Sequence, residues 1–246
     1  MAAARAADPR WPVDRVEPAR GIEAVIFDLD GVIVDSEIWW DEVRAAFATA
    51  HGRTWTEDDR LAVMGANSRQ WSATMRERLD LDQPDARIER AIVDGVVSRY
   101  RAEGAPTIAG AGEAVRRIAE RWPVAVASSA HQEVIDAALG AVGLDSLLSV
   151  VVSSDEVAHG KPEPDVYLEA ARRLGVAPEV CLVVEDSLNG VRAGRAAGMT
   201  VVLVPNRSIP PARGTAELAH VVVTRLADLD PESIAPVPPA DARAHG

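Results

Sequence analysis

Short apolar runs alternate with helical patterns along most of this chain, and this alternation limits its possible folds more than any other feature. The runs are rich in valine, and their continuous apolar character predicts strands that are buried on both faces. Helical patterns between them indicate a parallel sheet that is covered on both sides. We expect strands at Ala24–Phe27, Val124–Ala127, Ser149–Val152, Cys181–Val184, Thr200–Val204 and, more weakly, His220–Val223. We expect helices at Gly112–Trp122, Gln132–Gly140, Pro164–Gly175 and Ser187–Gly198.

One stretch of the chain breaks this alternation. Residues 38–107 show helical periodicity and no convincing strand, with apolar side chains such as Trp40, Val43 and Phe47 on one helical face. We therefore expect an α/β fold with a three-layer, Rossmann-like parallel-sheet core formed by residues 21–37 and 108–230. A small all-helical cap domain, residues 38–107, is inserted after the first strand.

The two ends of the chain lack this patterning. Residues 1–20 are rich in Ala, Pro and Arg and predict a loose N-terminal leader. Residues 231–246 are rich in Pro and Ala and predict a disordered tail.

Charge and composition argue against several classes of protein. The formal net charge is −12, whereas a nucleic-acid binder needs a basic face for phosphate contacts. No apolar run approaches the ~18 residues that span a bilayer, and the first 20 residues lack the apolar stretch of a signal peptide. The single cysteine, Cys181, excludes an intramolecular disulfide and a cysteine-based zinc site. We expect a cytoplasmic protein with no nucleic-acid or membrane partner.

One count concerns the basic residues. Of the 26 Lys and Arg residues, 25 are arginine and one, Lys161, is lysine. Arginine and lysine are not interchangeable where a compact point charge must lie beside an anion. Either Lys161 is a surface residue that survived by chance, or its ammonium group has a task that arginine cannot perform.

Polar residues follow four of the expected strands. In open α/β sheets, ligands bind beyond the carboxyl ends of the strands, and alternation places Asp28 and Asp30 on the same side of the chain there. Carboxylate oxygens in such a crowded place suit Mg²⁺, which takes one or two carboxylates together with water and phosphate oxygens. The residues at these ends are Asp28, Asp30, Ser128, Ser129, Lys161, Glu185 and Asp186.

The four segments that carry these residues resemble a known family. The motifs DLDGVIVDSE, VASSA, GKPEPDVY and EDSLNGVRAG, in this order, resemble those of the haloacid dehalogenase superfamily of phosphotransferases. The helical insertion is similar to that of the branch that includes β-phosphoglucomutase and many sugar-phosphate phosphatases. The resemblance covers about residues 21–229.

The resemblance implies a role for each carboxylate. Asp28 would be the nucleophile that forms an aspartyl-phosphate. Asp30 would protonate the leaving oxygen and then activate water. The Asp28 carboxylate, the Asp30 backbone carbonyl and Asp186 would hold Mg²⁺, and Glu185 would be either a ligand or a group that orients the ligands.

It also implies how the phosphate is bound. Ser128 would donate a hydrogen bond to the transferring phosphoryl group, with Ser129 beside it. A helix cap alone is the other interpretation of Ser128, but the two roles are compatible and we expect both. Lys161 would lie between Asp28 and the phosphate, where it offsets the negative charge of the transition state. This role agrees with the single-lysine count.

The cap is expected to choose the substrate. Arg69 and Asn67 lie in a segment that looks like the specificity loop of the cap, and Trp40 is a candidate ring beside a sugar. A solvated arginine and a core tryptophan are the alternative interpretations of two of these residues. β-Phosphoglucomutase carries a proton-handling histidine in the region where this chain has Trp39 and Trp40, which argues against a mutase.

These observations predict a Mg²⁺-dependent phosphatase of a small phosphorylated metabolite, with a sugar or polyol phosphate as the expected substrate. One alternative is a phosphosugar mutase, and another is a phosphometabolite-binding protein without turnover. The sequence is compatible with a monomer or a homodimer.

Overall fold

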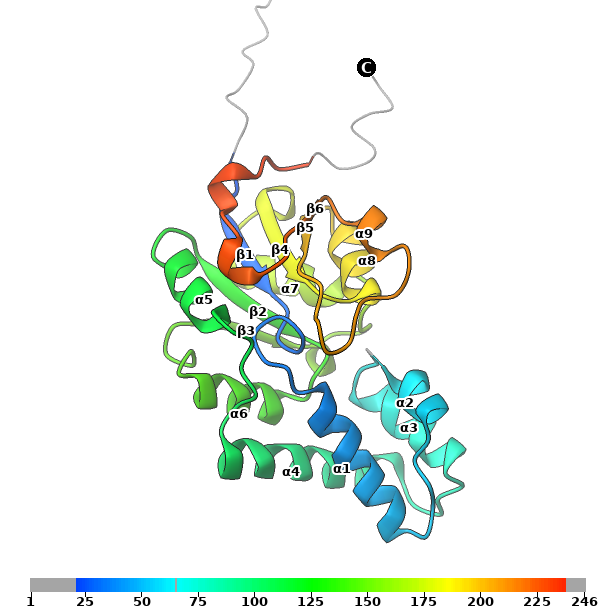
Figure 1. Cartoon of the computed structure of the whole chain (residues 1–246). Coiled ribbons are helices and arrows are strands. Elements are labelled where there is room, and N and C mark those ends of the chain that lie inside the picture. The colour runs from blue at the N-terminus through cyan, green and yellow to red at the C-terminus, as the bar shows by residue number, and fades with distance from the viewer. Residues whose placement is uncertain (1–20, 65, 238–246) are drawn as a thin grey trace, which may run out of the picture.

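The computed structural model describes residues 21–64 and 66–237, and a parallel sheet lies at its centre (Figure 1). The strands are β1 (Ala24–Phe27), β2 (Val124–Ser128), β3 (Val150–Ser153), β4 (Cys181–Glu185), β5 (Thr200–Leu203) and β6 (Val221–Val222). Their order across the sheet is β3-β2-β1-β4-β5-β6, and all neighbours are parallel. Ile26 in the middle of β1 lies between Ala125 of β2 and Val183 of β4. The expected α/β fold with a parallel sheet is confirmed.

Helices cover both faces of this sheet. They are α5 (Ala111–Ala119), α6 (Gln132–Val142), α7 (Asp165–Leu174), α8 (Leu188–Ala196) and the short α9 (Thr215–Leu218). Val25 and Phe27 of β1 belong to the apolar cluster that contains α5 and α6, whereas Ala24 and Ile26 belong to the cluster of α7 and α8. Because side chains alternate along a strand, β1 is buried on both sides. This accounts for the continuous apolar runs in the sequence.

Four helices separate β1 from α5 and form the cap. They are α1 (Glu37–Ala50), α2 (Glu57–Val63), α3 (Ser68–Arg78) and α4 (Asp85–Glu103). Local sequence fixes two of their starts, because Thr56 and Asn67 each accept a hydrogen bond from the backbone N–H three residues later, in capping boxes. Helix α4 packs against α1 and α3 and also against α6 of the core. The cap is therefore seated on the side of the core that carries α6 (Figure 1).

The C-terminal segment differs in part from its prediction. Residues 231–237 belonged to the expected disordered tail, but Pro231–Ser233 form a short 3₁₀ helix and Ile234 is buried. The backbone N–H of Val237 donates to Oγ1 of Thr200 at the start of β5, at 2.9 Å. Apolar residues among the prolines thus anchor this segment to the core. Residues 1–20 and 238–246, which include the expected leader and the rest of the tail, lie outside the described residues. Within the described ranges, no helix combines the length and apolar composition needed to cross a bilayer.

Candidate active site

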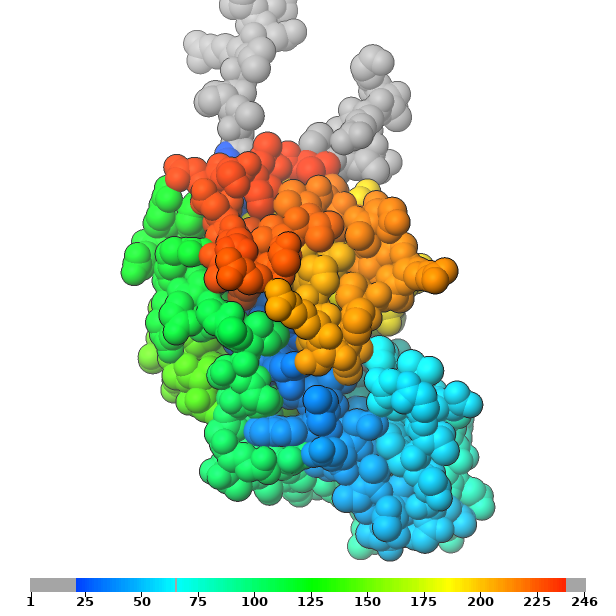
Figure 2. Space-filling model, in the orientation of Figure 1, coloured from blue at the N-terminus to red at the C-terminus, as the bar shows by residue number. Residues whose placement is uncertain are grey.

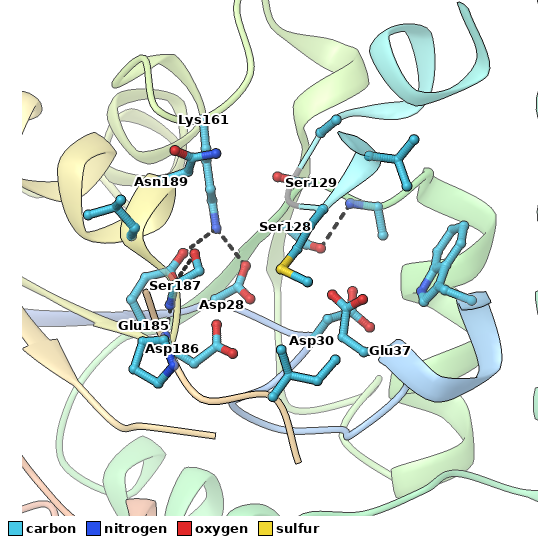
Figure 3. Close-up of a pocket in the computed structure, with 18 of the residues that line it drawn as sticks. Asp28, Asp30, Glu37, Ser128, Ser129, Lys161, Glu185, Asp186, Ser187 and Asn189 are labelled. Atoms are coloured by element: carbon cyan, nitrogen blue, oxygen red, sulfur yellow. Dashed lines mark hydrogen bonds and ion pairs between the residues drawn. The ribbon is translucent and has the colours of Figure 1, made fainter. Parts of the chain in front are cut away.

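A cavity of about 310 Å³ lies between the strand ends of the core and the cap, which form two lobes in Figure 2. The side chains predicted at the strand ends all line it (Figure 3). These residues are Asp28, Asp30, Ser128, Ser129, Lys161, Glu185 and Asp186. The structure thus brings together residues from four strand ends that lie far apart in the sequence.

Lys161 joins two carboxylates at the bottom of this cavity. Its Nζ donates to Oδ1 of Asp28 at 2.5 Å and to Oε1 of Glu185 at 2.7 Å, and also to the backbone carbonyl of Ala127 at 3.1 Å. Only 4% of the Lys161 side chain is exposed, and the Glu185 side chain is fully buried. The one lysine of the chain is therefore an internal counter-ion, and the surface interpretation of it is wrong.

The balance of charge in this cluster shifts the pKa values of its members. Burial raises the pKa of Asp28 to about 8; Lys161 opposes this shift and Glu185 adds to it. Burial alone would lower the pKa of Lys161, but Asp28 and Glu185 raise it above its ordinary value. Burial, together with the charges of Glu185 and Asp28, also raises the pKa of Asp186. Three carboxylates share one ammonium group, so the cluster favours any further positive charge.

Glu185 is held on all sides by the protein. Its Oε1 accepts from Lys161 and from the hydroxyl of Tyr167, and its Oε2 accepts from the backbone of Asp186 and from the backbone and hydroxyl of Ser187. A Cβ atom on Gly190 would lie 1.6 Å from Oε1 of Glu185, so only glycine fits beside this carboxylate. Burial would raise the pKa of Glu185, but Lys161 and the other donors lower it. Both oxygens are thus committed to hydrogen bonds within the protein.

Asp186 differs from Glu185 because its carboxylate accepts no hydrogen bond from any described residue. It points into the cavity toward Asp28 in Figure 3. Oxygens of Asp28, Glu185 and Asp186 lie within 4.8 Å of one another, which is close enough to hold one cation. Gly31 makes room for this arrangement, because a Cβ there would lie 2.0 Å from Oδ2 of Asp186 and its φ is +84°.

The donor set of this cluster suits Mg²⁺. Hard carboxylate oxygens are the ligands that this ion takes, usually one or two of them. Asp28 and Asp186 have oxygens that are free for this purpose, whereas Glu185 has none. Three carboxylates and one ammonium group also leave two negative charges, which a divalent cation balances.

Asp30 lies at the cap side of the cluster. Its Oδ1 accepts a hydrogen bond from the hydroxyl of Ser36. Burial raises the pKa of Asp30, and the bond from Ser36 opposes this shift only in part. A carboxyl group that keeps its proton nearer to neutral pH can act as a general acid.

Ser128 ends β2 and Ser129 follows it, and both lie on the opposite side of Asp28 from Glu185 (Figure 3). Oγ of Ser128 accepts from the backbone N–H of Ala130 at 3.0 Å, and Ser128 is 1% exposed. A hydroxyl that accepts this bond can still donate its own proton into the cavity. The helix cap of α6 is His131 rather than Ser128.

Three further features line the cavity, and the sequence did not single them out. Glu37 and Arg44 line it from α1, and the segment Ile209–Ala212 closes it from the core side. Asp35 positions this segment by accepting hydrogen bonds from Asn206 and Ser208. Glu37 was part of the DLDGVIVDSE motif, and burial with the nearby charge of Asp30 raises its pKa to about 7. The loop contact joins residues too distant in sequence for a pattern to reveal.

Of the three cap residues expected to contact substrate, the structure places only Trp40 at the cavity. Trp40 packs edge-on against Trp71, with 6.1 Å between ring centroids. Asn67 is the N-cap of α3, and a guanidinium nitrogen of Arg69 faces the backbone carbonyl of Asp155 at 3.4 Å. Both belong to the contact between cap and core instead, because the turn before α3 abuts the loop that carries Gly160.

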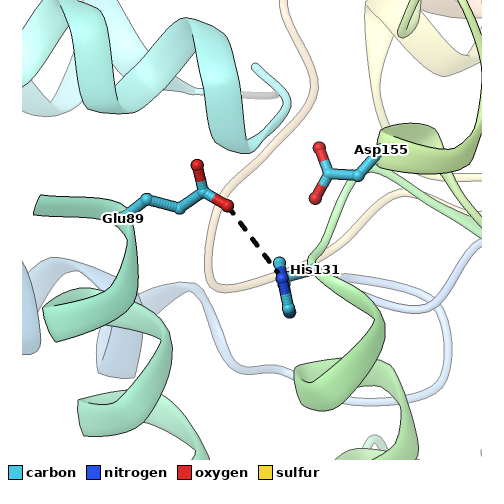
Figure 4. A group of neighbouring side chains, drawn as sticks. All are labelled: Glu89, His131 and Asp155. Carbon is cyan, nitrogen blue, oxygen red and sulfur yellow. Dashed lines mark ion pairs between the residues drawn. The ribbon is translucent and has the colours of Figure 1, made fainter. Parts of the chain in front are cut away.

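A second polar cluster lies at this same contact. Glu89 of α4, His131 and Asp155 place one ligand atom each within 4.8 Å of one another (Figure 4). Nδ1 of His131 accepts a hydrogen bond from the backbone N–H of Glu133 at 3.3 Å. In the neutral imidazole the proton is then on Nε2, the atom that faces Glu89 at 4.0 Å. The cluster therefore fits a polar contact between cap and core better than a metal site.

Known proteins are similar to this chain in sequence and in structure. A family model of haloacid dehalogenase-like hydrolases matches residues 22–198. The phosphorylated carbohydrates phosphatase of Thermotoga maritima is 33% identical over 181 residues, which cover 72% of this chain and 82% of that protein. The bifunctional riboflavin kinase/FMN phosphatase of Arabidopsis thaliana is 31% identical over 213 residues, which cover 83% of this chain. This chain spans only about half (54%) of the length of that protein. The crystal structure of CbbY from Rhodobacter sphaeroides in complex with phosphate has a TM-score of 0.74 at 26% identity, covering 85% of this chain and 96% of that one.

Proposed function

The chain belongs to the haloacid dehalogenase-like hydrolases and is a phosphatase of phosphorylated metabolites, and from this premise we propose that it works through an aspartyl-phosphate on Asp28 with Mg²⁺ as cofactor. Its substrate in this proposal is a small sugar or polyol phosphate. The observation that carries the proposal is the contact of Lys161 with Asp28 and Glu185 at the bottom of the cavity.

In the first step, a carboxylate oxygen of Asp28 attacks phosphorus. The bond between phosphorus and the oxygen of the metabolite breaks, and Asp30 gives its proton to that leaving oxygen. Lys161 and Ser128 face the transferring group, where the ammonium and hydroxyl donors stabilise the charge on its oxygens. The products are the free alcohol and an acyl phosphate on Asp28.

In the second step, Asp30 takes a proton from water as the water oxygen attacks phosphorus. The bond between phosphorus and the Asp28 oxygen breaks, which regenerates the carboxylate and releases inorganic phosphate. Asp30 ends the cycle protonated and ready for the next substrate. The raised pKa of Asp30 suits a group that must hold and return one proton.

Asp28, Asp186 and the backbone carbonyl of Asp30 would hold Mg²⁺, which supplies positive charge to the phosphate oxygens when bound. In this proposal Glu185 is a positioning residue. Its five hydrogen bonds fix Lys161 and the backbone of Asp186 and Ser187. Of Glu185 and Asp186, Asp186 would be the metal ligand, because its carboxylate has no hydrogen-bond partner among the described residues.

Phosphate release from a panel of phosphorylated metabolites, with Mg²⁺ and with EDTA, tests this proposal. We expect release that needs the metal, that falls by at least about 10³-fold in Asp28→Asn, and that persists in Asp155→Asn, which changes a carboxylate outside the cavity. Release without metal, or from Asp28→Asn at the wild-type rate, would contradict it. Transfer of phosphate to a second hydroxyl without release would identify the mutase instead. No reaction with any compound would favour a binding protein without turnover.

A further inference from the structure

Arg44 is a buried arginine that faces the cavity from the cap. It lies on α1 one turn after Trp40, and 7% of its surface is exposed. Its guanidinium carbon lies 5.1 Å from the ring centroid of Trp40 and 5.4 Å from that of Trp71. Two aromatic rings therefore fix the guanidinium in place, and cation–π contacts of this kind favour its charged form.

This guanidinium has no acceptor within the part of the chain that the structure describes. Nε is buried without a hydrogen-bond partner, and no carboxylate lies within 4.0 Å of its nitrogens. Buried charged groups in proteins are almost always paired, because an unpaired one loses its hydration without compensation. Burial lowers the pKa of Arg44 only to about 10, so the group remains charged at neutral pH.

The nearby carboxylates do not accept hydrogen bonds from the Arg44 guanidinium. Asp41 is engaged by the indole N–H of Trp55 at 2.6 Å, and Asp30 by Ser36. Glu37 lines the same cavity but lies beyond ion-pair distance, and its raised pKa of about 7 leaves it only partly charged at neutral pH. The donors of Arg44 are thus available to a group that enters the cavity.

The rest of the cap wall offers a ligand little polar contact. Leu61, Val63, Met64 and Ala66 line the cavity beside Trp71. The two described cations in the lining are Lys161 and Arg44, and Lys161 is already paired with Asp28 and Glu185. A neutral chain of hydroxyls would find few partners on this wall, whereas an anion would match the planar fork of an arginine.

We infer that Arg44 binds a second anionic group of the substrate, so that the preferred substrates are small phosphomonoesters that carry a carboxylate or a second phosphate at their far end. This inference rests on the proposed phosphatase function and narrows its substrate class. The cavity of about 310 Å³ is at the lower end of small-molecule sites, which run to ~300–1,000 Å³. It therefore favours compact substrates.

Matched substrate pairs test the inference. 3-Phosphoglycerate has a carboxylate where glycerol 3-phosphate has a hydroxymethyl group, and 6-phosphogluconate differs from sorbitol 6-phosphate in the same way. Fructose 1,6-bisphosphate and fructose 1-phosphate differ in a second phosphate. We expect wild-type kcat/KM to favour the more anionic member of at least one pair by about tenfold or more. Equal values in all three pairs would overturn the inference.

Variants of Arg44 then test whether this residue causes the preference for the more anionic substrates. We expect Arg44→Met to lose at least about tenfold more in kcat/KM on the anionic member of a pair than on p-nitrophenyl phosphate, which has no second anionic group. Arg44→Lys should keep part of the preference, since it keeps the charge and loses the fork. Arg99→Met is the matched control, because Arg99 also stacks on a tryptophan of the cap, Trp39, but does not line the cavity. Equal losses on all substrates would assign Arg44 to packing alone and refute the inference.

Binding to Asp28→Asn separates this inference from the proposed function. Isothermal titration of that variant with the same pairs needs no turnover and avoids reliance on a foldable Arg44 variant. Tighter binding of the anionic member supports the inference whatever the catalytic result. No difference in binding overturns it even if the protein is an active phosphatase.

Discussion

Lys161→Met removes the cation that lies between two buried carboxylates, Asp28 and Glu185, and we expect it to destabilise the fold as well as to abolish activity. The substitution deletes the contacts at 2.5 Å to Asp28 and 2.7 Å to Glu185, where the two carboxylate side chains are 10% and 0% exposed. Removing one partner of a buried ion pair costs about 3–5 kcal/mol, because the other charge stays buried without compensation. For a chain of this length, each 1 kcal/mol shifts Tm by about 2–4 °C, which predicts a fall of about 6–20 °C.

The loss should depend on pH in a definite direction. Without the ammonium, the folded-state pKa values of Asp28 and Glu185 lie above their unfolded values, so the folded protein retains protons that the unfolded chain releases. Stability then decreases as pH rises between those two values. We expect the difference in free energy of unfolding between wild type and Lys161→Met to be larger near pH 8 than near pH 5.

Urea unfolding at the two pH values, in EDTA so that no divalent cation replaces the lost charge, measures this difference. Tyr167→Phe is the control, because it removes a neutral donor from the same Glu185 oxygen at a cost of about 1 kcal/mol, with much less effect of pH. A Lys161→Met protein as stable as wild type at the higher pH would refute the argument that this lysine compensates buried charge.

Three other outcomes follow from the geometry of the site. Gly31→Ala places a Cβ 2.0 Å from Oδ2 of Asp186 and should lower kcat by about 100-fold or more. The control Gly52→Ala, also at positive φ but in open space, should cost only about 1 kcal/mol of stability and leave kcat unchanged. Equal kcat values for the two variants would contradict this prediction. Asp186→Asn should weaken Mg²⁺ binding by at least about tenfold in calorimetric titration, and a larger loss of affinity in Glu185→Gln than in Asp186→Asn would show that the ligand assignment is reversed. Mg²⁺ affinity should decrease as pH falls below about 8, because the raised pKa of Asp28 makes protons compete with the ion; an affinity that does not change between about pH 6 and pH 8 would argue against this competition.

The sequence allowed the core of the site to be predicted because its residues sit where the fold must place them. Parallel strands with apolar residues on both faces end at one edge of the sheet, so Asp28, Ser128, Lys161 and Glu185 had to lie near one another. The count of one lysine pointed to the same place. These inferences need only that the strands are parallel, which the patterning indicates.

The cap wall could not be predicted in the same way. Arg44 occupies a helix, where an arginine is usually solvated, and only the packing of α1 against α3 buries it between Trp40 and Trp71. Asn67 and Arg69 were expected at the cavity but lie at the contact between cap and core, since how the cap is seated depends on α4 and α6. The segment Ile209–Ala212 is placed by hydrogen bonds from Asn206 and Ser208 to Asp35, more than 170 residues earlier. Such contacts depend on tertiary packing, which periodicity does not record.

The most direct test of the proposed mechanism is to trap the covalent intermediate. Wild-type protein mixed with substrate and Mg²⁺ is quenched in acid within the first turnover, digested, and analysed by mass spectrometry for the peptide that contains Asp28. The account predicts that this peptide gains the mass of one phosphoryl group, that the gain needs Mg²⁺, and that it is absent from Asp28→Asn. Substrate turnover with no phosphoryl group on Asp28, or with the group on another residue, would contradict the account.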